Sequence, residues 1–391
     1  MKRITLLSVI FFLLASAANG QDTARRYRVI IFAPLYLDSA FDAAQQYRYT
    51  KDVFPKFINP GLEFYEGAQF ALDSLNKMGA ELEVHILDTR SASTSLQQQL
   101  DKPEVQTADL VIAHCSSNEV RSLSLFALQK NVPVINATVP NDAGTNGNPY
   151  FIILNPTLRT QCEGIYKFLQ KNYAVNPIVV FRRKGQADDL VKGLLDDYAK
   201  LSVSTPLKLK YVELVDSFTV NQLKAQLDTT RKTICVSGSL DVNFGKRLAL
   251  HLAKLNQQHP LALVGMPTWD AIARDFSRPE YKGLEIIYST PFYHSRMDKV
   301  SESIVNYFAE TMYARPSDMV FRGYETTWKF AQLLLQHKQD FPSNFSSKSF
   351  QLFTDFDIQP VLDRQTMTLD YFENKKLYFL KWQDGTMKIM P

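Results

Sequence analysis

The feature that most constrains the fold is a repeated alternation of short apolar runs with segments of helical periodicity. The apolar runs occupy residues 27–35, 83–88, 109–114, 132–137, 150–154, 177–181, 207–215, 233–238, 261–265 and 284–289. Most are apolar at successive positions, as in strands that are buried on both faces of a parallel sheet. Between them, apolar residues recur at helical spacing, as at Leu158, Cys162, Ile165 and Leu169. The pattern predicts an α/β fold of doubly wound parallel sheets with helices on both faces.

The length of 391 residues indicates more than one domain, because single cores stop growing at about 250–300 residues. The strand runs divide near Asn155-Pro156, with five before it and five after it. Residues 299–340 read as two helices. The tail reads as a β-hairpin with turns at Asn374-Lys375 and Asp384-Gly385. We therefore expect two lobes, each with its own sheet.

The first twenty residues have the pattern of a secretory signal peptide. Lys2 and Arg3 precede an apolar run over 4–14, and small residues follow it. We expect residues 1–20 to be cleaved after Gly20, which predicts a periplasmic or secreted protein. Later runs fall short of the roughly 18 apolar residues that a membrane helix needs, so we do not expect a membrane-inserted protein.

Charge and cysteine content narrow the partners further. The formal net charge of +4 falls to +2 without Lys2 and Arg3, and so nucleic acid and anionic membrane are not expected partners. Cys162 and Cys235 lie in apolar patterns and are expected to be buried thiols. A disulfide between Cys115 and one of them remains open.

Motifs of enzyme active sites are not found in the sequence. The six histidines have no metal-ligand spacing, and there is no G-x-S-x-G, phosphate-binding or dinucleotide-binding motif. We therefore expect no enzymatic activity, no metal site and no cofactor.

The stretch "VIAHCSSNEV" at 111–120 turns abruptly from apolar to polar. His114 is a poor base for Cys115, because neighbouring residues of a strand point to opposite faces. Ser116 and Glu119 instead fit a capping box that begins a helix over 120–130. A helix start at the carboxyl end of a parallel strand is where α/β proteins bind ligands, and its N–H groups favour an anion.

A second polar end follows the next strand run, at Asn136, Ala137 and Thr138. These residues are expected on the same rim as Ser116 and Ser117. Hydroxyl and N–H donors together with carbonyl acceptors suit a zwitterion.

Several segments resemble one family. They are "GLEFYEGAQFALDSLN" (61–76), "VIAHCSSNEVRSLS" (111–124), "VPVINATVPND" (132–142) and "FRGYETTWKFAQLLL" (321–335). Together with the order of elements, they resemble type I periplasmic binding proteins, in particular the branched-chain amino-acid (Leu/Ile/Val) substrate-binding proteins of ABC transporters. The similarity spans nearly the whole chain after the signal peptide.

The resemblance implies a clamshell of two lobes joined by a hinge of several crossovers. One lobe would comprise 27–155 plus about 296–340, and the other 156–295 plus about 341–391. It also implies an exported solute-binding protein that closes on a small, amino-acid-like ligand, with an ABC permease or an envelope receptor as partner.

The resemblance further implies roles for the rim residues. Ser116, Ser117 and Thr138 would hold the carboxylate of the ligand, and the Asn136 carbonyl would hold its ammonium. The second lobe departs from the family: Arg182 begins "RRKGQADD", where the family often has an aromatic residue. That loop is either solvated or recruits a negative group. Asp270 in "GMPTWDA" would replace the acidic residue that grips the ammonium, with Trp269 as a wall of the pocket.

Two other functions remain open from the residues. The aromatic-rich loop at 38–61 is long for a strand-to-helix connection, and such loops tend to be functional. With the terminal hairpin it would let a cell-envelope interaction module bind a protein partner without transport. An exported hydrolase that uses Cys115 is the third hypothesis.

Overall fold

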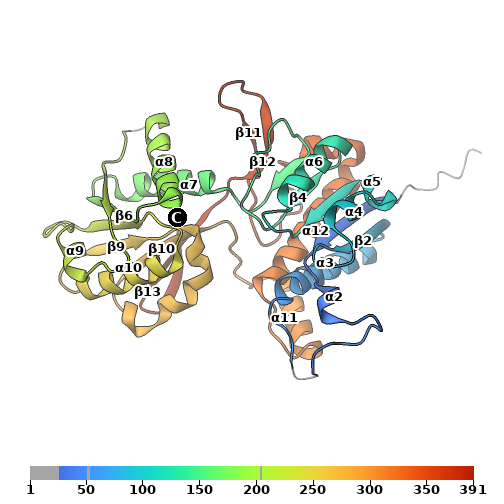
Figure 1. Ribbon diagram of the computed structural model, residues 1–391, viewed down its shortest axis with the longest axis horizontal. Helices are drawn as coiled ribbons and strands as arrows, with labels where there is room; N and C mark the ends of the chain where they lie inside the picture. The colour runs from blue at the N-terminus through green and yellow to red at the C-terminus, as the bar shows by residue number, and fades with distance from the viewer. Residues whose placement is uncertain (1–25, 51–52, 203–204) are drawn as a thin grey trace, which may run out of the picture.

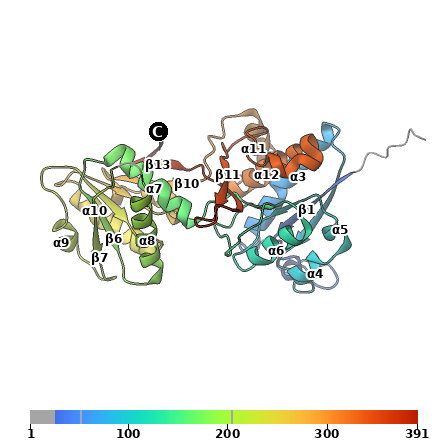
Figure 2. The same cartoon turned by 90° about the horizontal axis from the view of Figure 1, so that it is seen from above.

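A computed structural model describes residues 26–50, 53–202 and 205–391, which form two α/β lobes (Figure 1). The expected signal peptide lies outside the described residues. Seen from above, the lobes again lie side by side, with the connections between them in the middle of the molecule (Figure 2). Each lobe is built on a seven-stranded sheet, and the two sheets have matching strand orders.

The first sheet has the order β2-β1-β3-β4-β5-β12-β11. Its strands are β1 (Tyr27–Ala33), β2 (Leu82–Asp88), β3 (Leu110–Ala113), β4 (Val134–Asn136), β5 (Phe151–Ile153), β11 (Ile358–Leu362) and β12 (Leu369–Asn374). Strands β1 to β5 are parallel, β12 joins β5 in parallel, and β11 is antiparallel to β12.

Helices cover both faces of this sheet. On one face, α3 (Asn59–Lys77), α12 (Asp318–His337) and η3 (Lys338–Asn344) pack on alternate strand residues such as Val29 and Ile31. On the other face, α4 (Leu96–Leu100), α5 (Pro103–Gln106) and α6 (Val120–Lys130) pack on Ile30 and Phe32. The short α2 (Leu37–Ala40) and α11 (Lys299–Thr311) complete the lobe. The central strands β3, β4 and β5 are therefore buried on both sides, which explains their continuous apolar runs.

The second sheet has the order β7-β6-β8-β9-β10-β13-β14. Its strands are β6 (Ile178–Arg182), β7 (Leu209–Glu213), β8 (Thr233–Ser237), β9 (Leu261–Val264), β10 (Glu285–Thr290), β13 (Tyr378–Gln383) and β14 (Thr386–Met390). The first five are parallel, and β13 and β14 add an antiparallel edge.

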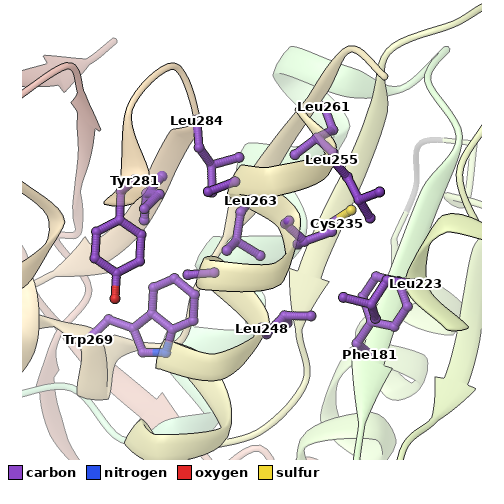
Figure 3. Close-up of a cluster of buried hydrophobic side chains, with 14 of the residues drawn as sticks. Phe181, Leu223, Cys235, Leu248, Leu255, Leu261, Leu263, Trp269, Tyr281 and Leu284 are labelled. Atoms are coloured by element: carbon purple, nitrogen blue, oxygen red, sulfur yellow. The ribbon is translucent and has the colours of Figure 1, made fainter. Parts of the chain in front are cut away.

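This sheet is also covered on both faces. Helices α7 (Leu158–Tyr173) and α8 (Gln186–Leu201) pack on one face. The other face carries α9 (Val220–Lys224), α10 (Val242–Leu255), η1 (Pro267–Ser277) and η2 (Pro279–Tyr281). Figure 3 shows the core of this face, where Leu248 of α10 and Leu263 of β9 lie among other buried apolar side chains.

The predicted fold class, two doubly wound α/β lobes, is confirmed. Three connections pass between the sheets, at 154–157, 291–298 and 375–377. The last differs from the expected hairpin, because β12 pairs with β5 of the first sheet and β13 pairs with β10 of the second. Placing all of 341–391 in the second lobe was therefore wrong for β11 and β12. Of the two turns expected in the tail, the one at Asp384-Gly385 joins two adjacent antiparallel strands, β13 and β14, and the one at Asn374-Lys375 does not.

None of the helices within 26–50, 53–202 and 205–391 is long and apolar enough to cross a bilayer. In the same ranges, no cluster of three or more His, Cys, Asp or Glu side chains has the geometry to hold a metal ion.

Glu66 on α3 predicts a pH-dependent contribution to stability. Burial, together with the charge of the nearby Glu63, raises the pKa of its carboxyl to about 7. Such a carboxyl stabilises the fold fully below its unfolded-state pKa, and this contribution is lost as the pH rises through the folded-state value. We therefore expect the free energy of unfolding of Glu66→Gln, relative to that of the wild type, to rise by about 1 kcal/mol from pH 5 to pH 8, after allowance for solvent screening.

Urea unfolding of both proteins at pH 5 and pH 8 measures this difference. Glu310→Gln, which replaces an exposed carboxyl on α11, is the control and should track the wild type at both values. A difference between Glu66→Gln and the wild type that does not change with pH would contradict the prediction.

Candidate functional site

A cavity of about 600 Å³ lies where the two lobes meet. The first lobe lines it with Pro140 and the start of α12, and the second lobe with the start of α7 and with Pro267, Thr268, Asp270 and Ala271. The connections at 154–157 and 291–298 form the remaining walls. Sites for small molecules have this size, and they are preferentially found between domains.

Both lobes place charged groups at the cavity, and Asp318 at the start of α12 also lines it. Arg322, the fifth residue of α12, contributes a guanidinium, and Asp270 of η1 contributes a carboxylate. The Arg322 guanidinium carbon lies 3.8 Å from the centroid of the Phe292 ring, which belongs to the second connection.

Two buried polar atoms at the cavity have no hydrogen-bond partner among the described residues, Nε of Arg322 and Oγ1 of Thr268. Burial lowers the pKa of Arg322, and Asp270 and Asp318 counteract this shift. The Asp270 side chain is exposed, yet the protein atoms around it raise the pKa of its carboxyl, while Arg322 lowers it. The arrangement can bind a polar ligand that carries complementary charges.

Of the predicted rim residues, Ser116 and Ser117 do not line this cavity. Helix α6 begins at Val120, as expected. Of the two hydrogen bonds of a capping box, only the one accepted by the Glu119 side chain forms, and the one accepted by the Ser116 side chain does not. The Ser116 N–H donates to the Glu119 carboxylate over 2.6 Å, and the Glu119 N–H donates to the Ser116 carbonyl over 3.0 Å. The helix shows no side-chain cap, because a turn at 117–119 separates Ser116 from its first residue. Ser117 is exposed beside the end of β3.

Cys115 is buried, and burial raises the pKa of its thiol to about 12, so the thiol stays protonated at neutral pH. It packs with the α6 side of the sheet, whereas the His114 ring lies 5.2 Å from the Phe64 ring of α3, measured between centroids. The two side chains thus point to opposite faces, as expected. All three cysteines, including Cys162 and Cys235, are free thiols, and the disulfide that was left open does not form.

Asn136 is fully buried, and its polar atoms form hydrogen bonds with other groups of the protein. Its Nδ2 donates to the Val139 carbonyl over 2.8 Å, its Oδ1 accepts from the Val139 N–H over 3.0 Å, and its own carbonyl accepts from the Leu154 N–H over 2.9 Å. The carbonyl expected to hold an ammonium therefore belongs to the sheet. Ala137 is also buried, at 1 % exposure.

Thr138 lies nearest the cavity among the predicted rim residues. Its carbonyl accepts a hydrogen bond of 2.7 Å from Asn155, which lines the cavity. Its Oγ1 is buried and has no hydrogen-bond partner among the described residues.

The bonds of Asn136 predict a structural effect of its removal. We expect Asn136→Ala to lower the free energy of unfolding by about 1–3 kcal/mol, because two backbone groups of the 139–141 turn lose buried partners. Urea unfolding measures the change. Asn146→Ala, an exposed amide of the same connection, is the control and should change stability by about 0.5 kcal/mol or less. Equal stability of the two variants would contradict the expectation.

In the second lobe, only Asp270 of the predicted residues lines the cavity. Arg182 is 4 % exposed at the end of β6, where it forms ion pairs with Asp189 and, over 2.7 Å, with Glu213. It is thus part of neither a solvated loop nor an open anion site.

Trp269 is fully buried in the core beside η1, where Figure 3 shows it among apolar side chains. It packs against Gly245 and Gly265, at which even a Cβ atom would clash with its ring. The tight turn of η1 directs Trp269 inward and leaves Asp270 exposed.

Arg322 is the main residue that sequence reasoning missed. The segment "FRGYETTW" lies in a range that the sequence predicts to be helical, but nothing in its pattern selected the arginine. A usable signal was present, because Arg322 follows the apolar run Met319–Phe321 near the start of the helix.

Comparisons with known proteins agree with this architecture. Residues 64–248 match the family model described as "Receptor family ligand binding region". No curated protein matches the chain.

Among solved structures, the chain resembles a putative branched-chain amino acid ABC transporter protein from Rhodospirillum rubrum (13 % identity, TM-score 0.65, 94 % of this chain and 100 % of that one). It also resembles an ABC transporter substrate-binding protein from Desulfitobacterium hafniense (12 % identity, TM-score 0.60, 94 % of this chain and 100 % of that one). A third similar structure is that of a branched-chain amino acid transporter substrate-binding protein from Streptococcus pneumoniae in complex with isoleucine (12 % identity, TM-score 0.52, 94 % of this chain and 99 % of that one). This chain therefore has the two-lobed fold of the type I periplasmic binding proteins, as the resemblance in its sequence implied.

Proposed function

We propose that this chain is an exported solute-binding protein that closes its two lobes on a small polar, amino-acid-like ligand. The observation that carries the proposal is the 600 Å³ cavity between the lobes, which receives Arg322 from one lobe and Asp270 from the other. Structures of the same fold include one that holds isoleucine, which supports a ligand of this size.

The physical mechanism is a shift between conformations. A ligand that contacts both lobes binds more strongly when the lobes are closed, and this difference in affinity moves the equilibrium toward the closed form. The three connections are the segments in which the change of angle would occur. The closed form would then deliver the ligand to an ABC permease or present it to an envelope receptor.

Thermal unfolding in the presence of amino acids, short peptides and small organic acids tests the proposal. A ligand at 100 times its Kd should stabilise the protein by about 2.7 kcal/mol, which raises the Tm of a chain of this length by about 3–4 °C. Asp270→Asn should reduce that rise, whereas Asp73→Asn, at an exposed position of α3, should not. If no compound raises the Tm of the wild type, the proposal is wrong.

An apolar surface favours a second function, binding of a partner polypeptide. A cavity of about 400 Å³ beside α2 is lined mainly by apolar residues, including Leu37, Phe41 and Phe54, which are 40–50 % exposed. A defined partner that binds the wild type but not the Phe41→Ser, Phe54→Ser double variant, combined with no response to small molecules, would favour this function.

A further inference from the structure

We infer that the Arg322 guanidinium binds a carboxylate of the ligand and thereby selects acids over their neutral analogues. The inference rests on the proposed function, because it names the chemical class that the cavity between the lobes would take. It also moves the anion site away from Ser116 and Ser117, where the sequence had placed it.

The position of Arg322 suits this role. It is the fifth residue of a 20-residue helix whose first residues also line the cavity. The Phe292 ring, 3.8 Å from the guanidinium carbon, supports one face of the group. A guanidinium held on an aromatic ring keeps its N–H donors along the edge, and these match the two oxygens of a carboxylate.

The acidic groups that influence Arg322 are engaged elsewhere or lie apart. Asp318 forms an ion pair with Arg296 over 2.5 Å. The two oxygens of the buried Glu325 accept hydrogen bonds of 2.9 Å from the N–H and the hydroxyl of Thr354. Asp270 approaches from the other lobe, but no ion pair within 4.0 Å joins it to Arg322 in the described residues.

Arg322 is therefore a cation without a direct anionic partner in the described part of the chain, and its buried Nε donates to no acceptor there. Leaving a buried donor unsatisfied is unfavourable, and a charge that is partly removed from water needs a counter-charge. A ligand carboxylate would supply both, through charge-assisted hydrogen bonds. Asp270 across the cavity is then placed for a positive group of the same ligand.

A purely structural role makes a different prediction. If Arg322 only balances the charge of Asp270 when the lobes close, neutral ligands and acids should bind equally well. The chemistry of the ligand therefore separates the two roles.

The experiment measures Kd by calorimetry on the mature chain with matched probes. L-Leucine and L-isoleucine are compared with their amides, and 4-methylpentanoate, L-glutamate and succinate with glucose and ribose. We expect the compounds that bind to be acids, and each amide to bind roughly 30-fold or more weakly than its acid. Arg322→Met should weaken the binding of acids by a similar factor, and Arg322→Lys by less. Arg121→Met, which removes an exposed arginine of α6, should have no effect.

The outcomes separate the inference from the function on which it rests. Equal affinity for an acid and its amide, binding of only the neutral sugars, or unchanged binding of acids by Arg322→Met would overturn the inference and leave the solute-binding function standing. If none of the probes binds, both fail for these compounds. If Arg322→Met does not fold, the acid–amide comparison on the wild type and the Arg322→Lys variant decide the matter.

Discussion

Gly323→Ala is expected to lower the free energy of unfolding by about 3 kcal/mol, near the upper end for overpacked cores. A Cβ atom at position 323 of α12 would lie 2.0 Å from the Phe64 carbonyl oxygen of α3. In return, a Cβ atom at Gly67 of α3 would lie 1.9 Å from the Val320 carbonyl oxygen of α12. Both obstacles are backbone atoms, so no rotamer change relieves the clash. The two helices would have to separate, although they cover one face of the first sheet together.

The chain contains a matched control for this substitution. Gly193 lies inside α8, and a Cβ atom there would meet no heavy atom within 4 Å. Gly193→Ala is therefore expected to stabilise the protein by about 0.5–1 kcal/mol, because alanine loses less backbone entropy in a helix. Urea unfolding of both variants measures the contrast. Gly323→Ala with wild-type stability would show that the contact between α3 and α12 is looser than described.

Glu373→Ala is expected to destabilise the protein by about 2–4 kcal/mol through the connection between the lobes. Glu373 is the penultimate residue of β12 in the first sheet and is 1 % exposed. Its carboxylate accepts from the Thr157 N–H over 2.6 Å and from the Thr160 hydroxyl over 2.9 Å, and it also pairs with Lys375. Thr157 is the N-cap of α7, and its own side chain makes no capping bond. A carboxylate from the first sheet thus caps a helix of the second lobe.

The loss of Glu373 would leave the Thr157 N–H and the Thr160 hydroxyl without their acceptor in a buried position. Calorimetric unfolding of Glu373→Ala, compared with Glu310→Ala at an exposed position of α11, measures the effect. Glu373→Gln should fall between the wild type and the alanine variant, because the amide keeps one acceptor oxygen but loses the charge. If Glu373→Ala unfolds at the same temperature as Glu310→Ala, the carboxylate does not hold this connection together.

The central strands of both lobes could be predicted because their signal is local. A strand that is buried on both faces must be apolar at successive positions, and the runs at 27–35 and 177–181 became β1 and β6. The start of α6 after a polar turn was predictable for the same reason. By contrast, residues 369–383 carry two strand patterns around a short turn-like segment, which is also the pattern of a hairpin. Their partners, β5 and β10, lie far away in the sequence, and only tertiary pairing separated β12 from β13.

The candidate site divides in a similar way. Asp270 was expected from the family resemblance, as the replacement for an acidic residue that grips the ammonium, and it does line the cavity. Asn136 and Arg182 looked equally suitable, but their bonds to Val139 and Glu213 engage them within their own lobes. Trp269 and Asp270 are neighbours in the sequence, but the turn of η1 buries the Trp269 side chain and leaves that of Asp270 exposed.

The sequence by itself determined the two-lobed α/β class and the positions of the parallel strands, since hydrophobic periodicity records which faces each element buries. Only the tertiary structure decided which polar groups are satisfied and which remain open to a ligand. Whether a polar group is satisfied depends on partners from distant segments. The Arg322 guanidinium, for example, lies on the Phe292 ring where the two lobes meet.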